Sequence, residues 1–321
     1  MESTDLQSPT PPSVALKVLD PPQLSFNDTG FSITDGITKT GFWTVSSAND
    51  IGWEFSLDLG VTWTRGEGAG FDVLGDGSKT IWVRARDDFG NTSEIVVAHC
   101  TLDTMAPAAP SATLRSGDQA EITRLSLGSL EPGSLWDYSI DQGQTWRPGD
   151  GQGFILSGNT LLSLKIRQQD QAGNVSMPIS IDLSASGAGW RELSGDPMLP
   201  TQLGTIESTI LVHGEIVKGD ADYAALDVPE GFKLKSAKWV FYESKDRISF
   251  YAMQRKALFD AGTDVRRMLS FGHFGPEDLG RNLLDGIPAD QLGAGPLVIW
   301  INQTGSVPTR YALEVLMEPI R

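Results

Sequence analysis

Two stretches of the chain, WEFSLDLGVTWTRGEGAGF at residues 53–71 and WDYSIDQGQTWRPGDGQGF at residues 136–154, repeat one unusual pattern. The same interval of 83 positions also separates later matched pairs, namely Arg84 and Arg167, Asp87 and Asp170, and Asn91 and Asn174. An uninterrupted interval of this size is longer than a solenoid unit and suits a small domain that occurs twice. The pattern therefore predicts two copies of one fold.

The local patterns inside each copy favour strands. TIWVRARD (80–87) and SLKIRQQD (163–170) alternate apolar and polar residues, which buries one face of a sheet. SLDLGVTW (56–63) and SIDQGQTW (139–146) place Asp and Gly in a short turn between two aromatic strands. Both copies are predicted to be all-β, with aromatic core residues at matched positions: Trp53, Trp63 and Phe71, and Trp136, Trp146 and Phe154.

A resemblance to a known family follows from these phrases. WEFSLDLGVTW and VRARDDFGNTS, with NDTGFSITDGIT before them and LDTMAPAAP after them, resemble the immunoglobulin-like repeats of large bacterial adhesins and biofilm-associated surface proteins. We call residues 14–103 the first repeat and residues 104–183 the second repeat. The resemblance implies a stalk of immunoglobulin-like β-sandwiches that holds a binding domain away from the cell, and calcium that stiffens it.

The repeat pattern ends at SASGAG (184–189), a small and flexible linker, and a different domain follows at 190–321. We call this domain the C-terminal module. GDADYAALDVPEGFKL, FGHFGPEDLGRNLLD and LGAGPLVIWINQTGSVPTRYALEV resemble the pre-peptidase C-terminal type of β-sandwich, although the chain is richer in Lys and Arg at 233–256 and 265–267. The predicted fold class is all-β, with two immunoglobulin-like sandwiches followed by a larger, jelly-roll-like β-sandwich.

Acidic turn residues are the candidate calcium ligands, because calcium binds six to eight oxygen atoms. Asp28, Asp35 and Asp103 are the candidates in and after the first repeat, with Asp87 weaker; the alternative is that these residues only form turns. The resemblance of the C-terminal module points to a structural cation at Asp220 and Asp222, with Asp196 as a helper. The alternative there is a tight turn before Tyr223.

Composition excludes several function classes. The net charge of −16 disfavours nucleic acid and anionic lipid, and a single cysteine, Cys100, permits no internal disulfide. Residues 1–13 show neither a basic nor an apolar export region, and we expect them to form a disordered linker. No apolar run is long enough to span a membrane. We expect an extracellular or cell-surface protein, inferred from the resemblance, that is a monomer.

No catalytic pattern is present: the three histidines lie in unrelated contexts, and metalloprotease, nucleophile-elbow and phosphate-loop motifs are missing. We expect a non-enzymatic adhesin fragment whose C-terminal module binds a glycan or a host or biofilm surface protein. The alternative is an accessory module of a secreted hydrolase whose catalytic domain lies outside this chain. Trp300 is the candidate stacking platform for a ligand, although PLVIWIN reads equally well as a buried strand with that ring inside. The loop residues His273, Phe274 and Asn302 are the further candidate ligand contacts, because they combine aromatic surface with hydrogen-bonding groups in Gly-flanked segments.

Overall fold

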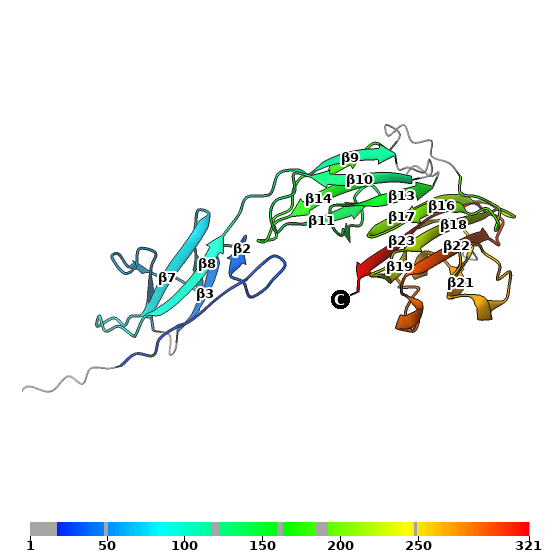
Figure 1. Ribbon diagram of the computed structural model, residues 1–321. Helices are drawn as coiled ribbons and strands as arrows, with labels where there is room; N and C mark the ends of the chain where they lie inside the picture. The colour runs from blue at the N-terminus through cyan, green and yellow to red at the C-terminus, as the bar shows by residue number, and fades with distance from the viewer. Residues whose placement is uncertain are drawn as a thin grey trace, which may run out of the picture. The chain divides into compact units, whose positions relative to one another are not determined.

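The computed structural model describes residues 18–47, 51–116, 122–158, 163–183, 192–246 and 249–320. The predicted linkers at 1–13 and 184–189 lie outside these residues. The described chain consists of strands and turns with three short 3-10 helices, η3 (Val265–Arg267), η4 (Pro276–Asp278) and η5 (Ala289–Gln291), which confirms the all-β fold class (Figure 1). The chain divides into two compact units, one of residues 1–106 with 170–174 and one of residues 107–169 with 175–321.

The first unit is a β-sandwich of two sheets. The three-stranded sheet has the order β1 (Gln23–Phe26), β3 (Phe42–Ser46), β6 (Gly70–Asp72). The five-stranded sheet has the order β2 (Ile37–Thr38), β8 (Val96–Leu102), β7 (Gly77–Ala85), β4 (Trp53–Ser56), β5 (Thr64–Arg65). Alternate residues of both sheets fill the core between them, where Trp43, Trp53 and Phe71 are the large aromatic side chains. Apolar and polar alternation in the sequence is thus realised as an inward and an outward face.

The repeated phrase forms the same hairpin in both repeats. In the first repeat, Ser56 Oγ donates to Asp58 Oδ1 at 2.7 Å, and Thr62 donates to the same carboxylate from its backbone N (2.8 Å) and its hydroxyl (2.6 Å). These bonds, first that from the Thr62 hydroxyl, lower the pKa of Asp58 to about 2. The carboxylate therefore holds the turn closed, which explains why the pattern keeps Ser, Asp and Thr at fixed spacing.

The second repeat has the same hydrogen bonds at the matched positions. The Asp141 carboxylate accepts from the Ser139 hydroxyl at 2.7 Å and from the Thr145 hydroxyl at 2.5 Å. Burial opposes the shift at Asp141, yet the bonds from Thr145 and Ser139 still lower the pKa of this carboxyl group. The same hydrogen bonds thus close the hairpin in both repeats.

The second tryptophan of each phrase differs from the expectation of a core residue. Trp63 and Trp146 are half-buried, and each ring lies beneath an arginine guanidinium, Arg84 at 3.8 Å and Arg167 at 4.1 Å from the ring centroid. The repeat interval of 83 also joins these arginines, so ring and cation were repeated together. Trp53 and Trp136, by contrast, are buried as expected.

The second unit contains three sheets. The six-stranded sheet has the order β19 (Phe232–Glu243), β23 (Thr309–Pro319), β17 (Thr209–Ile216), β13 (Gly153–Gly158), β10 (Ile122–Gly128), β9 (Ser111–Ser116). The four-stranded sheet has the order β12 (Arg147–Pro148), β11 (Leu135–Ser139), β14 (Leu164–Gln169), β15 (Ile179–Ile181). The five-stranded sheet has the order β16 (Thr201–Thr205), β18 (Ala221–Val228), β22 (Gly295–Gln303), β20 (Ser249–Gln254), β21 (Ser270–Phe274).

The six-stranded sheet joins the second repeat to the C-terminal module. Strand β13 of the repeat pairs in parallel with β17 of the module, with Ile155 opposite Ile210 and Gly158 opposite His213. Gly158 has φ +126°, and a Cβ atom at this position would overlap the carbonyl oxygen of His213, so the close approach requires glycine. The boundary expected at 184–189 therefore does not separate two independent sandwiches: the two regions share a sheet and one compact unit.

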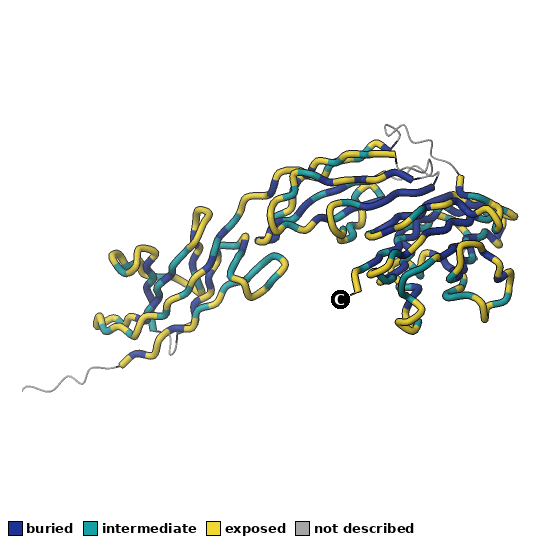
Figure 2. The backbone as a smooth tube through the Cα atoms, viewed as in Figure 1, coloured by how far each residue is buried: buried dark blue, intermediate teal, exposed yellow. Residues whose placement is uncertain are grey.

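The shared sheet is buried on both faces. Leu211, Val240 and Ala312 pack with the core of the second repeat, around Trp136 and Tyr138. Their neighbours along the same strands belong to the core of the C-terminal module, as do Ile210, Trp239 and Tyr311. Residues 209–214 of β17 are all buried, and most of β23 is buried as well (Figure 2). This is why TILVHGEI at 209–216 reads as an apolar run and not as an alternation.

Candidate ligand-binding face

The outer face of the five-stranded sheet carries most of the predicted ligand contacts. Strand β22 sends Leu297, Ile299 and Ile301 into the module core, so the alternate residues Trp300 and Asn302 lie on the opposite face. Phe250 of β20 is paired with both Asn302 and His273, and Ala252 with both Trp300 and Phe271. Strand register therefore gathers five large side chains on one face, which we call the aromatic face: Phe250, Phe271, His273, Trp300 and Asn302.

The rings of this face contact one another. Trp300 lies edge-to-face with Phe250, with 5.3 Å between ring centroids, and Phe250 lies edge-to-face with His273 at 5.4 Å. Tyr223 of β18 stacks on the other side of Trp300 at 6.2 Å, with only 6° between the ring planes. Contacts of this kind hold each ring in a fixed orientation, which reduces the entropy lost when a ligand binds.

The exposure of the face is graded. His273 is exposed and Phe271 is 45% exposed, whereas Phe250, Trp300 and Asn302 are half-buried. Phe259, from the loop after β20, lies 5.2 Å from Trp300 and covers part of it. The accessible surface is therefore the Phe271–His273 edge together with the uncovered parts of the inner rings.

Phe274, the fourth predicted ligand contact, points the other way. Its side chain is 1% exposed and stacks on Trp239 in the module core, with 3.8 Å between ring centroids. Alternation along β21 explains this, because residue 274 must face opposite to residue 273. Phe274 offers no surface to a ligand. Sequence reasoning missed Phe250 and Phe271, which the stretches SFYAMQ and SFGHF could have indicated, and also Tyr223 of β18.

The predicted calcium ligands of the first unit each close a local turn. Asp28 accepts from Gly36 N at 2.9 Å, Asp35 from Ile37 N at 3.0 Å and Asp103 from Met105 N at 3.1 Å. Asp28 Oδ1 is buried and has no hydrogen-bond partner within the described residues. Over these same residues, no group of three or more His, Cys, Asp or Glu side chains is arranged to hold a metal ion. Calcium binding therefore stays a prediction.

The three predicted cation ligands of the C-terminal module have separate local contacts. Asp196 accepts from Met198 N at 2.8 Å, and Asp220 accepts from Ala221 N at 2.9 Å. Asp222 is 2% exposed and accepts from the buried Tyr311 hydroxyl at 2.5 Å. Burial raises the pKa of Asp222 to about 7, and the negative charge of Asp220 adds to the effect. Sequence reasoning did not anticipate Tyr311 as the partner.

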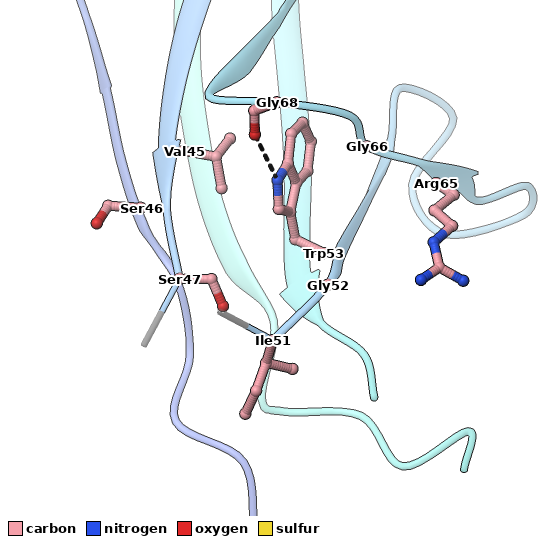
Figure 3. A pocket seen from close by; sticks show the side chains of 9 residues that line it. All are labelled: Val45, Ser46, Ser47, Ile51, Gly52, Trp53, Arg65, Gly66 and Gly68. Carbon is pink, nitrogen blue, oxygen red and sulfur yellow. Dashed lines mark hydrogen bonds between the residues drawn. The ribbon is translucent and has the colours of Figure 1, made fainter. Parts of the chain in front are cut away.

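A pocket of about 430 Å³ lies in the first unit beside Trp53 (Figure 3). The indole N–H of Trp53 points to the carbonyl oxygen of Gly68 at 3.4 Å. Val45, Ser47 and Ile51 are among the other lining residues, and the Arg65 side chain points away from the indole. Residues 48–50 lie outside the described residues. We assign no ligand to this pocket.

No family model matches the chain, and no curated protein matches it. Among solved structures, the fibronectin(III)-like modules of Clostridium thermocellum CbhA align at 10% identity with a TM-score of 0.33, over 50% of this chain and 90% of theirs. Carbohydrate-binding modules of the β-sandwich superfamily align at 9% identity with a TM-score of 0.22, over 93% and 97%. Chicken CNTN1 FN1–FN3 domains align at 11% identity with a TM-score of 0.21, over 89% and 96%. These low scores leave the function to be inferred from the face itself.

Proposed function

We propose that this chain is a non-enzymatic, extracellular binding protein whose C-terminal module holds a glycan on the aromatic face. Flat rings suit the apolar faces of sugar rings, and the nearby Asn302 amide and His273 imidazole supply hydrogen-bonding groups for hydroxyls. The observation that supports the proposal is the register that places Phe271, His273 and Phe250 side by side with Trp300 and Asn302. We also propose that the two repeats form part of the stalk of a bacterial surface adhesin, and that this stalk presents the aromatic face of the C-terminal module.

No helix of the described residues is long and apolar enough to cross a membrane. The adhesin assignment rests on the resemblance of the repeats, and the glycan assignment on the aromatic face. Each is therefore open to a separate test.

The test is a glycan array with the full chain, because isolating residues 190–321 would break the sheet between β13 and β17. We expect Phe271→Ala combined with His273→Ala to weaken binding to the selected glycan about tenfold or more, which corresponds to about 1.4 kcal/mol. Phe89→Ala is the matched control, since this aromatic side chain is 93% exposed in the first unit. Equal loss in both variants, or unchanged binding by the double variant, would refute the assignment of the face.

A further inference from the structure

The loop between β20 and β21 (residues 255–269) gathers positive charge on an acidic protein. Arg255, Lys256, Arg266 and Arg267 line one pocket of about 310 Å³, with Gln254 and Gln291 among the other lining residues. No carboxylate belongs to the described residues that line it, although the chain carries a net charge of −16. A pocket of this size is near the lower end of the range of about 300–1,000 Å³ for small-molecule sites.

Hydrogen bonds from one nitrogen of the Arg255 guanidinium fix its position, while a second nitrogen has no acceptor among the described residues. Its Nη2 donates to the carbonyl oxygens of Gly293 and Ala294, each at 2.7 Å. Its Nη1 is buried and has no hydrogen-bond partner in the part of the chain that the structure describes. Carbonyl oxygens orient a guanidinium without cancelling its charge, and a buried N–H without an acceptor is costly. Arg255 is therefore prepared for an anionic acceptor.

The other three cations are only partly compensated. Asp260 accepts from Lys256 at 2.7 Å and from Arg267 at 2.5 Å, and Asp264 accepts from Arg266 Nε at 2.9 Å. With Asp227, whose negative charge acts on Arg255, three carboxylates face the four cations, which leaves a local excess of one positive charge. Arginine forks match the two oxygens of a carboxylate or sulfate, and several such donors in one pocket select an oxyanion over a neutral group.

The same loop reaches the aromatic face. Gln254 fixes it by accepting from the backbone N–H groups of Asp260 and Ala261 at 3.0 and 3.1 Å, and Phe259 lies against Trp300. We propose that the pocket of Arg255, Lys256, Arg266 and Arg267 binds the sulfate or carboxylate group of an acidic polysaccharide. The polysaccharide as the source of the anion rests on the proposed function, whereas the oxyanion site itself does not.

The first experiment uses inorganic sulfate alone and measures heat of binding and thermal unfolding of the full chain at constant ionic strength. We expect saturable binding that Arg255→Gln weakens at least tenfold and Arg266→Gln about threefold. Arg65→Gln is the control, because Arg65 is likewise exposed and paired with an aspartate, but in the first unit. Sulfate stabilises many proteins without binding a site, so an unsaturable rise in melting temperature that is equal in all variants would overturn the site. Since Arg255 is partly buried, the exposed Arg266 keeps the test valid if Arg255→Gln does not fold.

The second experiment compares dextran sulfate with neutral dextran of equal length. We expect the sulfated polymer to bind at least tenfold more tightly, with the gain lost in Arg255→Gln and kept in Arg65→Gln. Equal affinity for both polymers, in a protein that binds inorganic sulfate, would overturn the assignment to a polysaccharide. Binding of inorganic sulfate without binding of any glycan, sulfated or neutral, would refute the proposed function and leave the oxyanion site in place.

Discussion

The two repeats share a hairpin but differ on one strand, and this difference decides what each can join. Strand β6 of the first repeat and β13 of the second are matched at the interval of 83, with Phe71 opposite Phe154 in the alignment and both rings in a core. One residue later, the first repeat has the exposed Asp72, whereas the second has Ile155, which is 2% exposed. A charged side chain on the outward face of an edge strand opposes pairing with another strand and packing of another sheet on that face, whereas an isoleucine favours both. The second repeat is thus built to continue into the C-terminal module.

The largest effect is expected from exchanging these two residues. Ile155→Asp places a carboxylate in the shared core and should lower the free energy of unfolding of the second unit by more than about 4 kcal/mol. Asp72→Ile should change the first unit by less than about 0.5 kcal/mol, because residue 72 is exposed. Denaturant unfolding of both variants measures this. Similar losses in the two variants would contradict the difference between β6 and β13.

Next come the matched core tryptophans, Trp53 and Trp136, which are 5% and 4% exposed. Each Trp→Ala substitution should cost about 3–5 kcal/mol, because it leaves a large cavity. Calorimetry should show that Trp53→Ala lowers the transition of the first unit only. Trp136→Ala should lower the temperature of the transition that includes the C-terminal module, because the second repeat and this module share a sheet. Trp146→Ala, at a half-buried site, is the control with a smaller expected loss.

The sequence predicts a structural feature when that feature depends on residues close together along the chain. The repeat interval, the strand alternation and the buried Trp53 and Trp136 were predictable, because each follows from short-range pattern. The pairing of β13 with β17 was not, since it joins Ile155 to Ile210 across an intervening linker. The run GFILSG at 153–158, compared with GFDVLG at 70–75, was the available signal.

The candidate site shows the same limit. Strand register brings Trp300, His273 and Asn302 to one face, and this register depends on pairing between strands that are distant in the sequence. Phe274 was misjudged because its parity on β21 could not be known without the start of that strand. Parity within a strand, once fixed by one buried neighbour, assigns every other residue of the strand.

Asp222 gives the stability of the second unit a dependence on pH between about 4 and 7. Its pKa of about 7 in the folded state lies above the ordinary value of 3.8. Between these pH values the folded state binds the extra proton, so stability is fully present below about pH 4 and is lost as pH rises through 7. Over this pH range, the free energy of unfolding of the wild type should change relative to that of Asp222→Asn by at most about 4 kcal/mol, because each pKa unit corresponds to about 1.36 kcal/mol. Equal pH slopes in both proteins would refute the raised pKa.

A smaller effect, of the same sign in the two repeats, is expected from the hairpin carboxylates. Asp58 has a lowered pKa, so the stability it contributes is present above pH 3.8 and lost as pH falls through about 2. Carboxyl NMR titration should find its midpoint near 2, and that of Asp141 below the ordinary value. Asp58→Ala and Asp141→Ala should each lower the melting temperature of their own unit. Asp88→Ala, whose side chain is 88% exposed, should leave it unchanged.

The smallest expected effect concerns calcium and again separates the two repeats. Asp28 presents a buried carboxylate oxygen without a described partner, and the second repeat lacks the NDTG and DGIT phrases altogether. An unpaired buried oxygen is a suitable ligand for a hard cation, which would remove the cost of leaving it unsatisfied. Calcium at ten times its Kd should raise the stability of the first unit by about 1.4 kcal/mol, by mass action. Calorimetry of the full chain in calcium and in chelator, with Asp28→Asn as the control variant, measures this shift. A first transition that is unchanged by chelation would reduce Asp28, Asp35 and Asp103 to turn formers, and a shift that persists in Asp28→Asn would place the ion elsewhere.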